Sequence, residues 1–225
     1  MQCAINTLQV GILGTNCYIY RESEGLPGWI IDPGGDADQI IAAARQASGG
    51  ITGILLTHIH FDHILALTDL CAHYGTDLRI YTHREGKDSL GPEGGSVQIA
   101  VLNSMSPGLG NSYAEKLTHL PEATDIIIDD GTPIPGTTLA AFHTPGHARE
   151  ALCYISTEQQ VVFSGDTLFR ESIGRSDFSG GSSGDLKASI RNKLYTLSDE
   201  MAVYPGHGEP TTIGHEKRRN PFVRG

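Results

Sequence analysis

The heptapeptide Thr57-His58-Ile59-His60-Phe61-Asp62-His63 is the most informative stretch of this 225-residue chain. Four candidate metal ligands stand within six consecutive positions, in the pattern His-x-His-x-Asp-His. Neutral imidazole and carboxylate groups suit zinc, iron or manganese. Ligands this dense cannot all serve one tetrahedral ion without strain, so we predict two sets, His58 with His60 and Asp62 with His63. The alternative is a histidine-rich surface loop, and the spacing favours a dinuclear metal site.

The composition limits the classes of partner. The chain is 39% hydrophobic, enough for a substantial core, and its length fits one large domain or two small ones. The formal net charge of -10 opposes a general electrostatic attraction to nucleic acid or anionic membranes. No stretch approaches the ~20 apolar residues that span a bilayer, and the start resembles the first strand of a mature domain. We therefore expect a cytoplasmic protein that acts on a small molecule, in an oligomeric state that the sequence leaves open.

The cysteines carry no predicted chemistry. They are scattered and form no C-x-x-C pair, so we expect small, buried, reduced side chains and neither disulfides nor ligands. The four are Cys3, Cys17, Cys71 and Cys153.

Strands and helices alternate along the chain, which favours an α/β fold. The apolar run 51–56 predicts a buried strand, and the metal motif follows directly at its C-terminal end. Such an order places the ligands in a crevice beyond the carboxyl end of the strand. We expect a two-sheet sandwich flanked by helices. The other predicted strands are 3–9, 16–20, 29–31, 126–128, 138–143, 151–156, 161–164 and 202–204, and the predicted helices are 36–47, 64–74, 186–197 and 211–219.

Residues 84–121 have weak periodicity and two glycine-proline clusters, 91–95 and 106–110. This composition predicts a long loop inserted near the site, because long irregular segments in compact domains are often lids. A surface loop without a role is the alternative.

Three later strands also end in a candidate ligand preceded by glycine, at Gly146-His147, Gly165-Asp166 and Gly206-His207. Glycine beside a ligand lets the backbone approach an ion closely without a Cβ clash. Three protein ligands and one shared carboxylate leave room for a water at each ion, which is typical of a catalytic site. We expect one ion on His58, His60 and His147, a second on Asp62, His63 and His207, and Asp166 as the bridge between them.

Together these motifs resemble the metallo-β-lactamase fold, a family of αβ/βα sandwich metallohydrolases. The resemblance implies a four-layer sandwich in a single domain over residues 1–225. It also implies that Asp32 supports the ligands without binding metal itself. The segments that carry it come in the family's order: Asp32-Pro33-Gly34-Gly35, the heptapeptide 57–63, Thr144-Pro145-Gly146-His147, Ser164-Gly165-Asp166 and Pro205-Gly206-His207.

Within this family the chain most resembles the glyoxalase II-like branch, in particular its short, single-domain bacterial hydroxyacylglutathione hydrolases. Segments 174–178, 205–214 and 220–222 carry this closer likeness. It implies two divalent ions, most typically zinc, with iron or manganese as alternatives. It also implies cleavage of an S-(hydroxyacyl)-thiol conjugate such as S-lactoylglutathione by a metal-bound hydroxide, with Asp62 and Asp166 as catalytic residues.

The chain departs from glyoxalase II in the segment after His207, which in that family contributes to substrate binding. Only residues 208–225 follow His207, too few for the helical domain that contributes basic groups to glutathione binding, and Gly208-Glu209-Pro210 replaces a tyrosine-containing segment. These departures leave the carrier thiol open. Arg149 and Arg175 are the expected substrate contacts, because a guanidinium can hold an anionic carrier. The basic run 217–219 is more typical of the last turn of a helix.

No separate general acid is evident, and a thiolate with a pKa of ~8.5 leaves without prior protonation, so the chemistry favours a thioester. One alternative is a persulfide dioxygenase with a single iron, which the full second ligand set disfavours. A lactonase or phosphodiesterase on the same fold is another. A non-catalytic metal-dependent regulator would bind metal without turnover, and the open ligand sets disfavour it.

Overall fold

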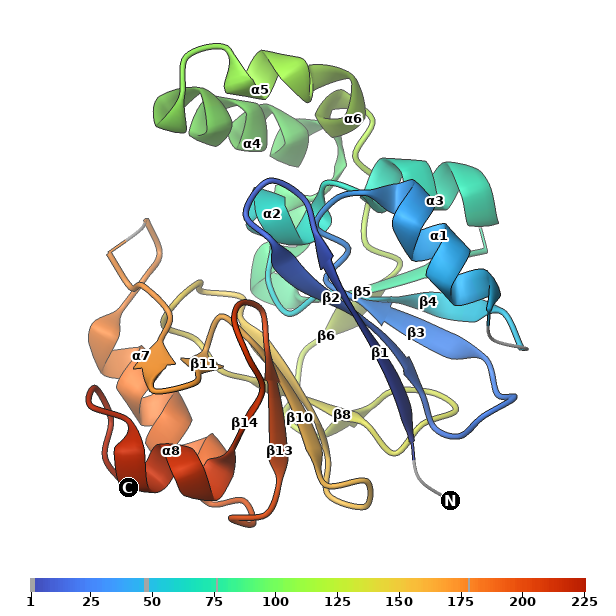
Figure 1. Cartoon of the computed structure of the whole chain (residues 1–225). Helices are drawn as coiled ribbons and strands as arrows, with labels where there is room; N and C mark the ends of the chain where they lie inside the picture. The colour runs from blue at the N-terminus through green and yellow to red at the C-terminus, as the bar shows by residue number, and fades with distance from the viewer. Residues whose placement is uncertain (1–2, 47–48, 76, 178) are drawn as a thin grey trace.

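The computed structural model describes residues 3–46, 49–75, 77–177 and 179–225. Two six-stranded sheets face each other, and helices cover the outer face of each (Figure 1). This arrangement is the predicted four-layer αβ/βα sandwich, so the sequence-based fold class is confirmed. None of the helices in the described ranges is long and apolar enough to cross a membrane.

The first sheet follows the sequence order, β1-β2-β3-β4-β5-β6. Strands β1 to β3 pair antiparallel, whereas β3 to β6 are parallel. The carboxyl ends of the parallel strands therefore lie at one edge, and the metal motif follows β4 there. The strands are β1 (Ala4–Val10), β2 (Thr15–Arg21), β3 (Gly28–Ile31), β4 (Ile51–Leu55), β5 (Arg79–His83) and β6 (Asp125–Ile127).

The second sheet has the order β14-β13-β10-β9-β8-β7. Its one parallel pair is β10 with β13, so these two strands also end at a common edge. Its strands are β7 (Thr132–Pro133), β8 (Ala140–His143), β9 (Leu152–Ser156), β10 (Val161–Gly165), β13 (Ala202–Pro205) and β14 (Thr211–Thr212), and β11 (Leu168–Phe169) forms a small hairpin with β12 (Ser172–Ile173).

Alternation along β2 shows how the layers form. Tyr18 and Tyr20 point into the core between the sheets, where they meet Phe163 of β10, whereas Cys17 and Ile19 point to the helices outside. Successive side chains of a strand face opposite sides, so a strand with helices on one side and a sheet on the other is buried throughout. All seven residues of β2 are buried.

The outer layers are amphipathic helices. α1 (Ala37–Arg45) and α3 (Leu67–Tyr74) pack on the first sheet, and α7 (Ser183–Ser189), η2 (Ile190–Leu194) and α8 (Ile213–Arg219) pack on the second. The predicted helix 64–74 is divided, because a short helix, α2 (Phe61–Ile64), precedes α3. The predicted end of the first helix, Ala47, lies outside the described residues.

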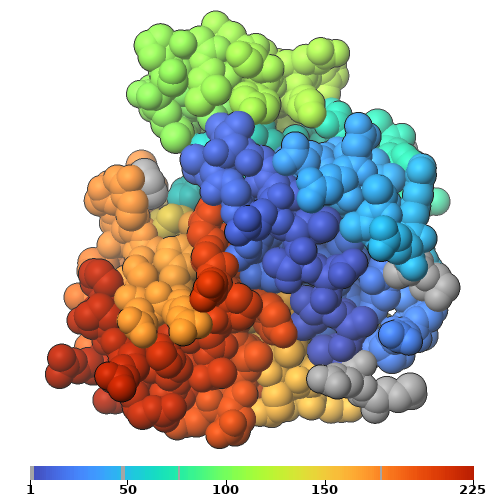
Figure 2. Space-filling view, in the orientation of Figure 1, coloured from blue at the N-terminus to red at the C-terminus, as the bar shows by residue number. Residues whose placement is uncertain are grey.

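Residues 84–121 are not the predicted loop. They form a helical segment made of η1 (Arg84–Ser89), α4 (Gly91–Met105), α5 (Leu109–Ser112) and α6 (Ala114–Thr118). Helices α4 to α6, green in Figures 1 and 2, stand beyond α2. In the glycine-proline cluster 91–95, which indicated a loop, the residues have other roles. Pro92 occupies the first turn of α4, where its missing N–H costs nothing, and Gly95 allows α4 to touch α6.

Candidate metal centre

The predicted ligands come from the ends of strands in both sheets. The loop after β4 carries His58 and His60, and Asp62 and His63 follow in α2. The loops after β8, β10 and β13 carry His147, Asp166 and His207. Three overlapping groups form, each with its ligand atoms within 4.8 Å of one another: His58, His60 and His147; His58, His63 and Asp166; and Asp62, His63 and His207.

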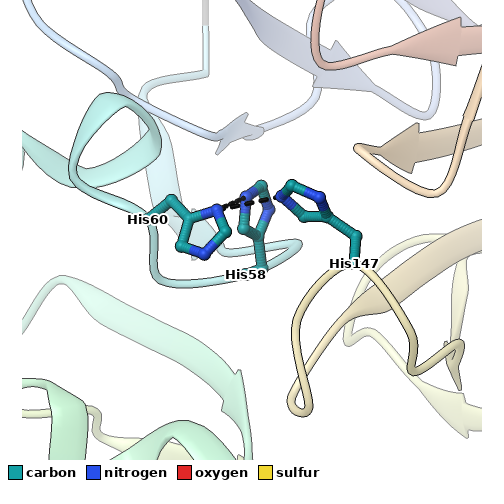
Figure 3. Close-up of side chains that lie close together, drawn as sticks. All are labelled: His58, His60 and His147. Atoms are coloured by element: carbon teal, nitrogen blue, oxygen red, sulfur yellow. Dashed lines mark hydrogen bonds between the residues drawn. The ribbon is translucent and has the colours of Figure 1, made fainter. Parts of the chain in front are cut away.

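The first group consists of three imidazoles whose nitrogens converge on one point (Figure 3). His60 Nδ1 lies 3.1 Å from His58 Nε2 and 2.9 Å from His147 Nε2. Two nitrogens that bind one tetrahedral zinc at 2.0–2.1 Å lie about 3.3–3.4 Å apart. These spacings therefore fit three imidazoles around one ion.

The second group adds a carboxylate. Asp62 Oδ2 lies 3.1 Å from His207 Nε2 and 3.6 Å from His63 Nε2. One carboxylate oxygen and two imidazole nitrogens are a donor set that suits zinc, iron or manganese.

Asp166 lies between the two groups. Its Oδ1 is 3.4 Å from His63 Nε2, and its Oδ2 is 3.5 Å from His147 Nε2 and 3.7 Å from His207 Nε2. Oδ1 thus faces the second group, whereas Oδ2 lies near one histidine of each group, so the carboxylate stands between the two. The neighbouring backbone is close: a Cβ at position 206 would overlap Asp166 Oδ1, so glycine is needed there.

Two buried atoms test whether this donor set fits a cation. Within the described ranges, His63 Nε2 and Asp166 Oδ1 are buried and form no hydrogen bond of acceptable geometry. A buried polar atom without such a bond is costly and rare. Both atoms point into the centre, where a divalent ion would satisfy them, so the residues fit a metal.

A buried carboxylate and a hydroxyl hold the ligands from behind. Asp32 accepts hydrogen bonds from Thr57 N at 2.8 Å and Thr57 Oγ1 at 2.7 Å. Because Thr57 Oγ1 donates to Asp32, it accepts from His58 Nδ1 at 3.1 Å, which leaves His58 Nε2 free to bind metal. Asp32 Oδ2 also lies 3.0 Å from His63 Nδ1. The expected supporting position of Asp32 agrees with these contacts.

Backbone and hydroxyl groups orient two further ligands. His147 Nδ1 donates to the carbonyl oxygen of Arg175 at 2.7 Å, which directs His147 Nε2 toward His60. Thr15 Oγ1 donates to Asp62 Oδ2 at 3.2 Å. Thr15 carries no signal in the sequence, because its partner lies 47 residues away.

The electrostatics keep two histidines of the first group, His58 and His60, neutral and keep the carboxylates ionised. Burial, followed by the neighbouring imidazoles, lowers the pKa of His60 to about 4 and that of His58 well below its usual value. Burial alone would raise the pKa of Asp62 and of Asp166, but the surrounding histidines hold both below the usual range. Metal ligands need these protonation states.

His63 has the opposite balance. Burial disfavours its charged form, but Asp62, Asp32 and Asp166 outweigh burial and raise its pKa well above the usual value. Three carboxylates around one imidazole form a strongly negative centre, which a divalent cation would compensate.

The two expected substrate contacts are exposed and lie close to His147: the Arg175 carbonyl oxygen is 2.7 Å from His147 Nδ1, and Arg149 is two positions beyond His147 in the sequence. The Arg175 guanidinium is exposed and binds Asp177 through two hydrogen bonds, at 2.8 and 3.0 Å. Arg149 is also exposed, and its carbonyl oxygen accepts from His143 Nε2 at 2.8 Å. His143 in turn stacks on His83 with ring centroids 3.8 Å apart. Phe178, the last residue of the 174–178 motif, lies outside the described residues.

Comparison with known proteins agrees with this geometry. A model of the Metallo-beta-lactamase superfamily matches residues 10–207. The chain belongs to this superfamily. Superfamily members are metal-dependent hydrolases with a dinuclear metal site, and this chain brings together three groups of His and Asp side chains that could hold a metal ion.

The relatives of this superfamily member match it along nearly their whole length. It is 33% identical to an uncharacterized protein of Mycobacterium leprae, covering 98% of this chain and 99% of that protein. It is 35% identical to Hydroxyacylglutathione hydrolase GloC of Haemophilus influenzae, covering 97% of each. It is 34% identical to a probable metallo-hydrolase of Bacillus subtilis, YqgX, covering 97% of this chain and 96% of that protein.

Two solved structures are similar over the whole fold. BLEG-1, titled a B3 metallo-beta-lactamase, superposes with a TM-score of 0.83 at 34% identity, covering 99% of this chain and all of that one. TTHA1623, solved in a di-iron-bound form, superposes with a TM-score of 0.76 at 31% identity, covering 97% of this chain and all of that one.

Proposed function

We propose that this superfamily member is a dinuclear thioester hydrolase that cleaves an S-(hydroxyacyl)-thiol conjugate such as S-lactoylglutathione. The observation that carries the proposal is the pair of three-residue ligand groups with Asp166 between them. The 35% identity to a protein named hydroxyacylglutathione hydrolase, along 97% of both chains, supports the thioester.

The proposed cofactor is a pair of divalent ions. His58, His60 and His147 would hold one, Asp62, His63 and His207 the other, and Asp166 both. Zinc is our first choice, with iron or manganese as alternatives, and the di-iron form of TTHA1623 supports iron. When bound, such ions lower the pKa of a held water from 15.7 to about 7 and polarise a carbonyl oxygen.

The protein's own residues would prepare the site in three ways. Burial of His58, His63 and Asp62 excludes bulk water around the reacting groups and strengthens their electrostatic interactions. The hydrogen bond from Thr15 Oγ1 fixes the plane of the Asp62 carboxylate, which we propose orients the attacking water. Asp166, which lies between the two ligand groups, would fix their position relative to each other.

The leaving group explains the choice of a thioester. Every titratable side chain of the three ligand groups is assigned to an ion, so none of them is left to protonate a leaving group. A thiolate, with an ordinary pKa of ~8.5, departs without a proton, whereas an amine does not. The exposed side chains of Arg149 and Arg175 would contact an anionic carrier.

The proposal includes the compartment. All four cysteines are free and none pairs with another. Reduced thiols suit the cytoplasm, where low-molecular-weight thiol conjugates are also available as small-molecule substrates.

The test is thiol release from S-lactoylglutathione by protein reconstituted with zinc, manganese or iron, beside an Asp166→Ala control and a β-lactam as the comparison substrate. Turnover of the thioester that Asp166→Ala loses supports the proposal. A second thioester, with the same acyl group on a thiol other than glutathione, shows which carrier the enzyme prefers. Hydrolysis of the β-lactam without hydrolysis of either thioester would overturn the proposal.

A further inference from the structure

The backbone of Ile59 connects His58 to His60. Side chains hydrogen-bond to both its N–H group and its carbonyl oxygen. Gln98 Nε2 donates to the Ile59 carbonyl oxygen at 2.7 Å, and Glu150 Oε1 accepts from the Ile59 N–H at 3.2 Å. Gln98 belongs to α4 and Glu150 to the loop after His147, so two segments remote in sequence meet at one residue of the metal loop.

The surroundings make this contact a rigid one. The Ile59 and Gln98 side chains are almost fully buried, at 2% and 6% exposure. A Cβ at Gly86 would lie 2.6 Å from Ile59 Cδ1 and 2.8 Å from Glu150 Cγ, so the backbone of η1 packs directly against both side chains. Water therefore has little access to replace Gln98, whereas Glu150 is half-buried; loss of Gln98 would leave the buried Ile59 carbonyl oxygen without its side-chain partner.

We infer that Gln98 and Glu150 are positioning residues of the metal centre: they lock the Ile59 peptide, so that His58 Nε2 and His60 Nδ1 point at the same ion. Glu150 holds the peptide group that joins His58 to Ile59, and Gln98 holds the one that joins Ile59 to His60, so a rotation of the Ile59 backbone would move the rings on both sides of it. The inference rests on the proposed dinuclear site. It gives the helical segment 84–121 a role as a support of the metal loop, in place of the lid that the sequence suggested.

Groups behind a metal ligand orient it, and their loss typically weakens metal affinity by about 10–100-fold. The effect should be confined to the first ligand group, since the side-chain hydrogen bonds of Gln98 and Glu150 within the described ranges go to the backbone between His58 and His60. The second group is held separately, by Thr15 at Asp62 and by Asp32 at His63.

The experiment measures Zn²⁺ affinity by chelator competition in two backgrounds, His207→Ala, which retains the first group, and His147→Ala, which retains the second. Gln98→Met and Glu150→Met remove the polar partners and keep most of the side-chain volume. Glu150→Gln keeps an oxygen that can accept from Ile59 N–H. Asn103→Leu is the matched control, because Asn103 is an amide of the same helix that binds Gly110 N within the helical segment at 2.9 Å.

We expect both Met variants to lose about tenfold or more in affinity in the His207→Ala background and less than about twofold in the His147→Ala background. Glu150→Gln and Asn103→Leu should stay close to their parents. The visible absorption spectrum of the Co²⁺ form should change with Gln98→Met, and the melting temperature of the metal-free protein should fall no more than with Asn103→Leu.

Unchanged affinity in Gln98→Met, or an equal loss in both backgrounds accompanied by a similar loss in Asn103→Leu, would overturn the inference. These outcomes need no substrate. Wild-type protein that binds two ions and hydrolyses no thioester would contradict the proposed function alone, whereas wild-type protein that binds no metal would contradict both.

Discussion

At the scale of single residues, Asp32 shows how one carboxylate organises several ligands. It contacts the backbone and hydroxyl of Thr57 and the ring of His63, and through Thr57 it sets the orientation of His58. Its backbone lies in the left-handed region, with φ 51°, a conformation that Asp and Asn tolerate better than other residues. The contacts of the carboxylate explain why Asp stands at the start of the Asp-Pro-Gly-Gly segment.

Asp32→Asn tests this role, since Asn keeps the shape and tolerates the same backbone. The NH₂ group of Asn would replace one carboxylate oxygen and would face a donor of Thr57, which donates to both oxygens of Asp32. We therefore expect a loss of roughly 1–3 kcal/mol in the free energy of unfolding. Metal affinity should fall by about 10–100-fold, because the ring of His63 loses its carboxylate partner. Chemical denaturation of the metal-free protein and metal titration measure the two effects. Asp38→Asn, at an exposed position in the first turn of α1, is the control, and equal results for both variants would refute the role.

At the scale of elements, α4 is the helix that the sequence concealed. Its glycines reduce helix propensity, and its apolar residues divide between two faces. Leu102 and Leu117 pack with Phe61 and Leu65 of the neighbouring helical turn, and Gly95 brings α4 against α6. The helix therefore depends on tertiary contacts, which overrule the propensity of its residues.

Gly95→Ala gives a prediction whose sign depends on packing. Alanine favours a helix over glycine by about 1 kcal/mol, yet a Cβ at this position would overlap the carbonyl oxygen of Leu117. We expect a net loss of about 1–3 kcal/mol in stability, because the backbones of α4 and α6 must separate. The matched control is Gly184→Ala in α7, an exposed site where the nearest atom, Ser182 Oγ, lies 3.9 Å away.

The control should be stabilised by about 0.5–1 kcal/mol, since nothing opposes the gain in helix propensity there. Urea denaturation of the two variants measures both effects. Stabilisation of Gly95→Ala by the same amount would show that α4 and α6 do not pack as closely as described.

At the scale of the whole molecule, the two sheets are fastened to each other at both ends of β2. At its start, Asn16 Nδ2 donates to the carbonyl oxygens of Pro205 at 3.0 Å and Gly208 at 2.8 Å, and so holds the loop of His207. Beyond its other end, Glu22 accepts from Tyr20, from the backbone and hydroxyl of Thr138, and from Gln159. The site end and the far end of the sandwich are therefore both closed by polar contacts.

Glu22 makes the closure at the far end sensitive to pH. Burial would raise its pKa, but the hydrogen bonds from Thr138, Tyr20 and Gln159 lower it below the ordinary value of 4.5. Folding thus favours the ionised form. The stability that Glu22 contributes is fully present above that ordinary value and is lost as the pH falls through the lower pKa of the folded state.

Glu22→Gln should therefore cost roughly 1–3 kcal/mol in the free energy of unfolding at pH 7, and the difference from wild type should shrink as the pH falls below about 4.5. Denaturation of both proteins between pH 7 and pH 3 measures it. Glu158→Gln, at an exposed position of the β9–β10 turn, should leave the pH dependence unchanged. A difference that is constant across this range would contradict the role of the Glu22 charge.

Much of this architecture was predictable from local pattern. The predicted strands 51–56 and 16–20 match β4 and β2 to within one residue at each end, because burial in a sheet leaves a hydrophobic pattern in neighbouring residues of the chain. β5 was not predicted, since Arg79 and Thr82 interrupt its apolar pattern. Neither were Gln98 and Glu150 at the metal loop: the partners lie 39 and 91 residues from Ile59, and nothing in their own neighbourhoods reveals the contact.

The sequence by itself determined the chemistry and the order of the parts. Seven residues with metal-binding side chains stand at the ends of predicted strands, and both features depend only on residue type and on neighbours along the chain. The tertiary structure alone decided that Asp166 lies between two groups, that Asp32 faces both Thr57 and His63, and that α4 supports the Ile59 peptide. These are contacts between segments far apart in sequence, and they exist only once burial of the shared core has brought the strand ends together.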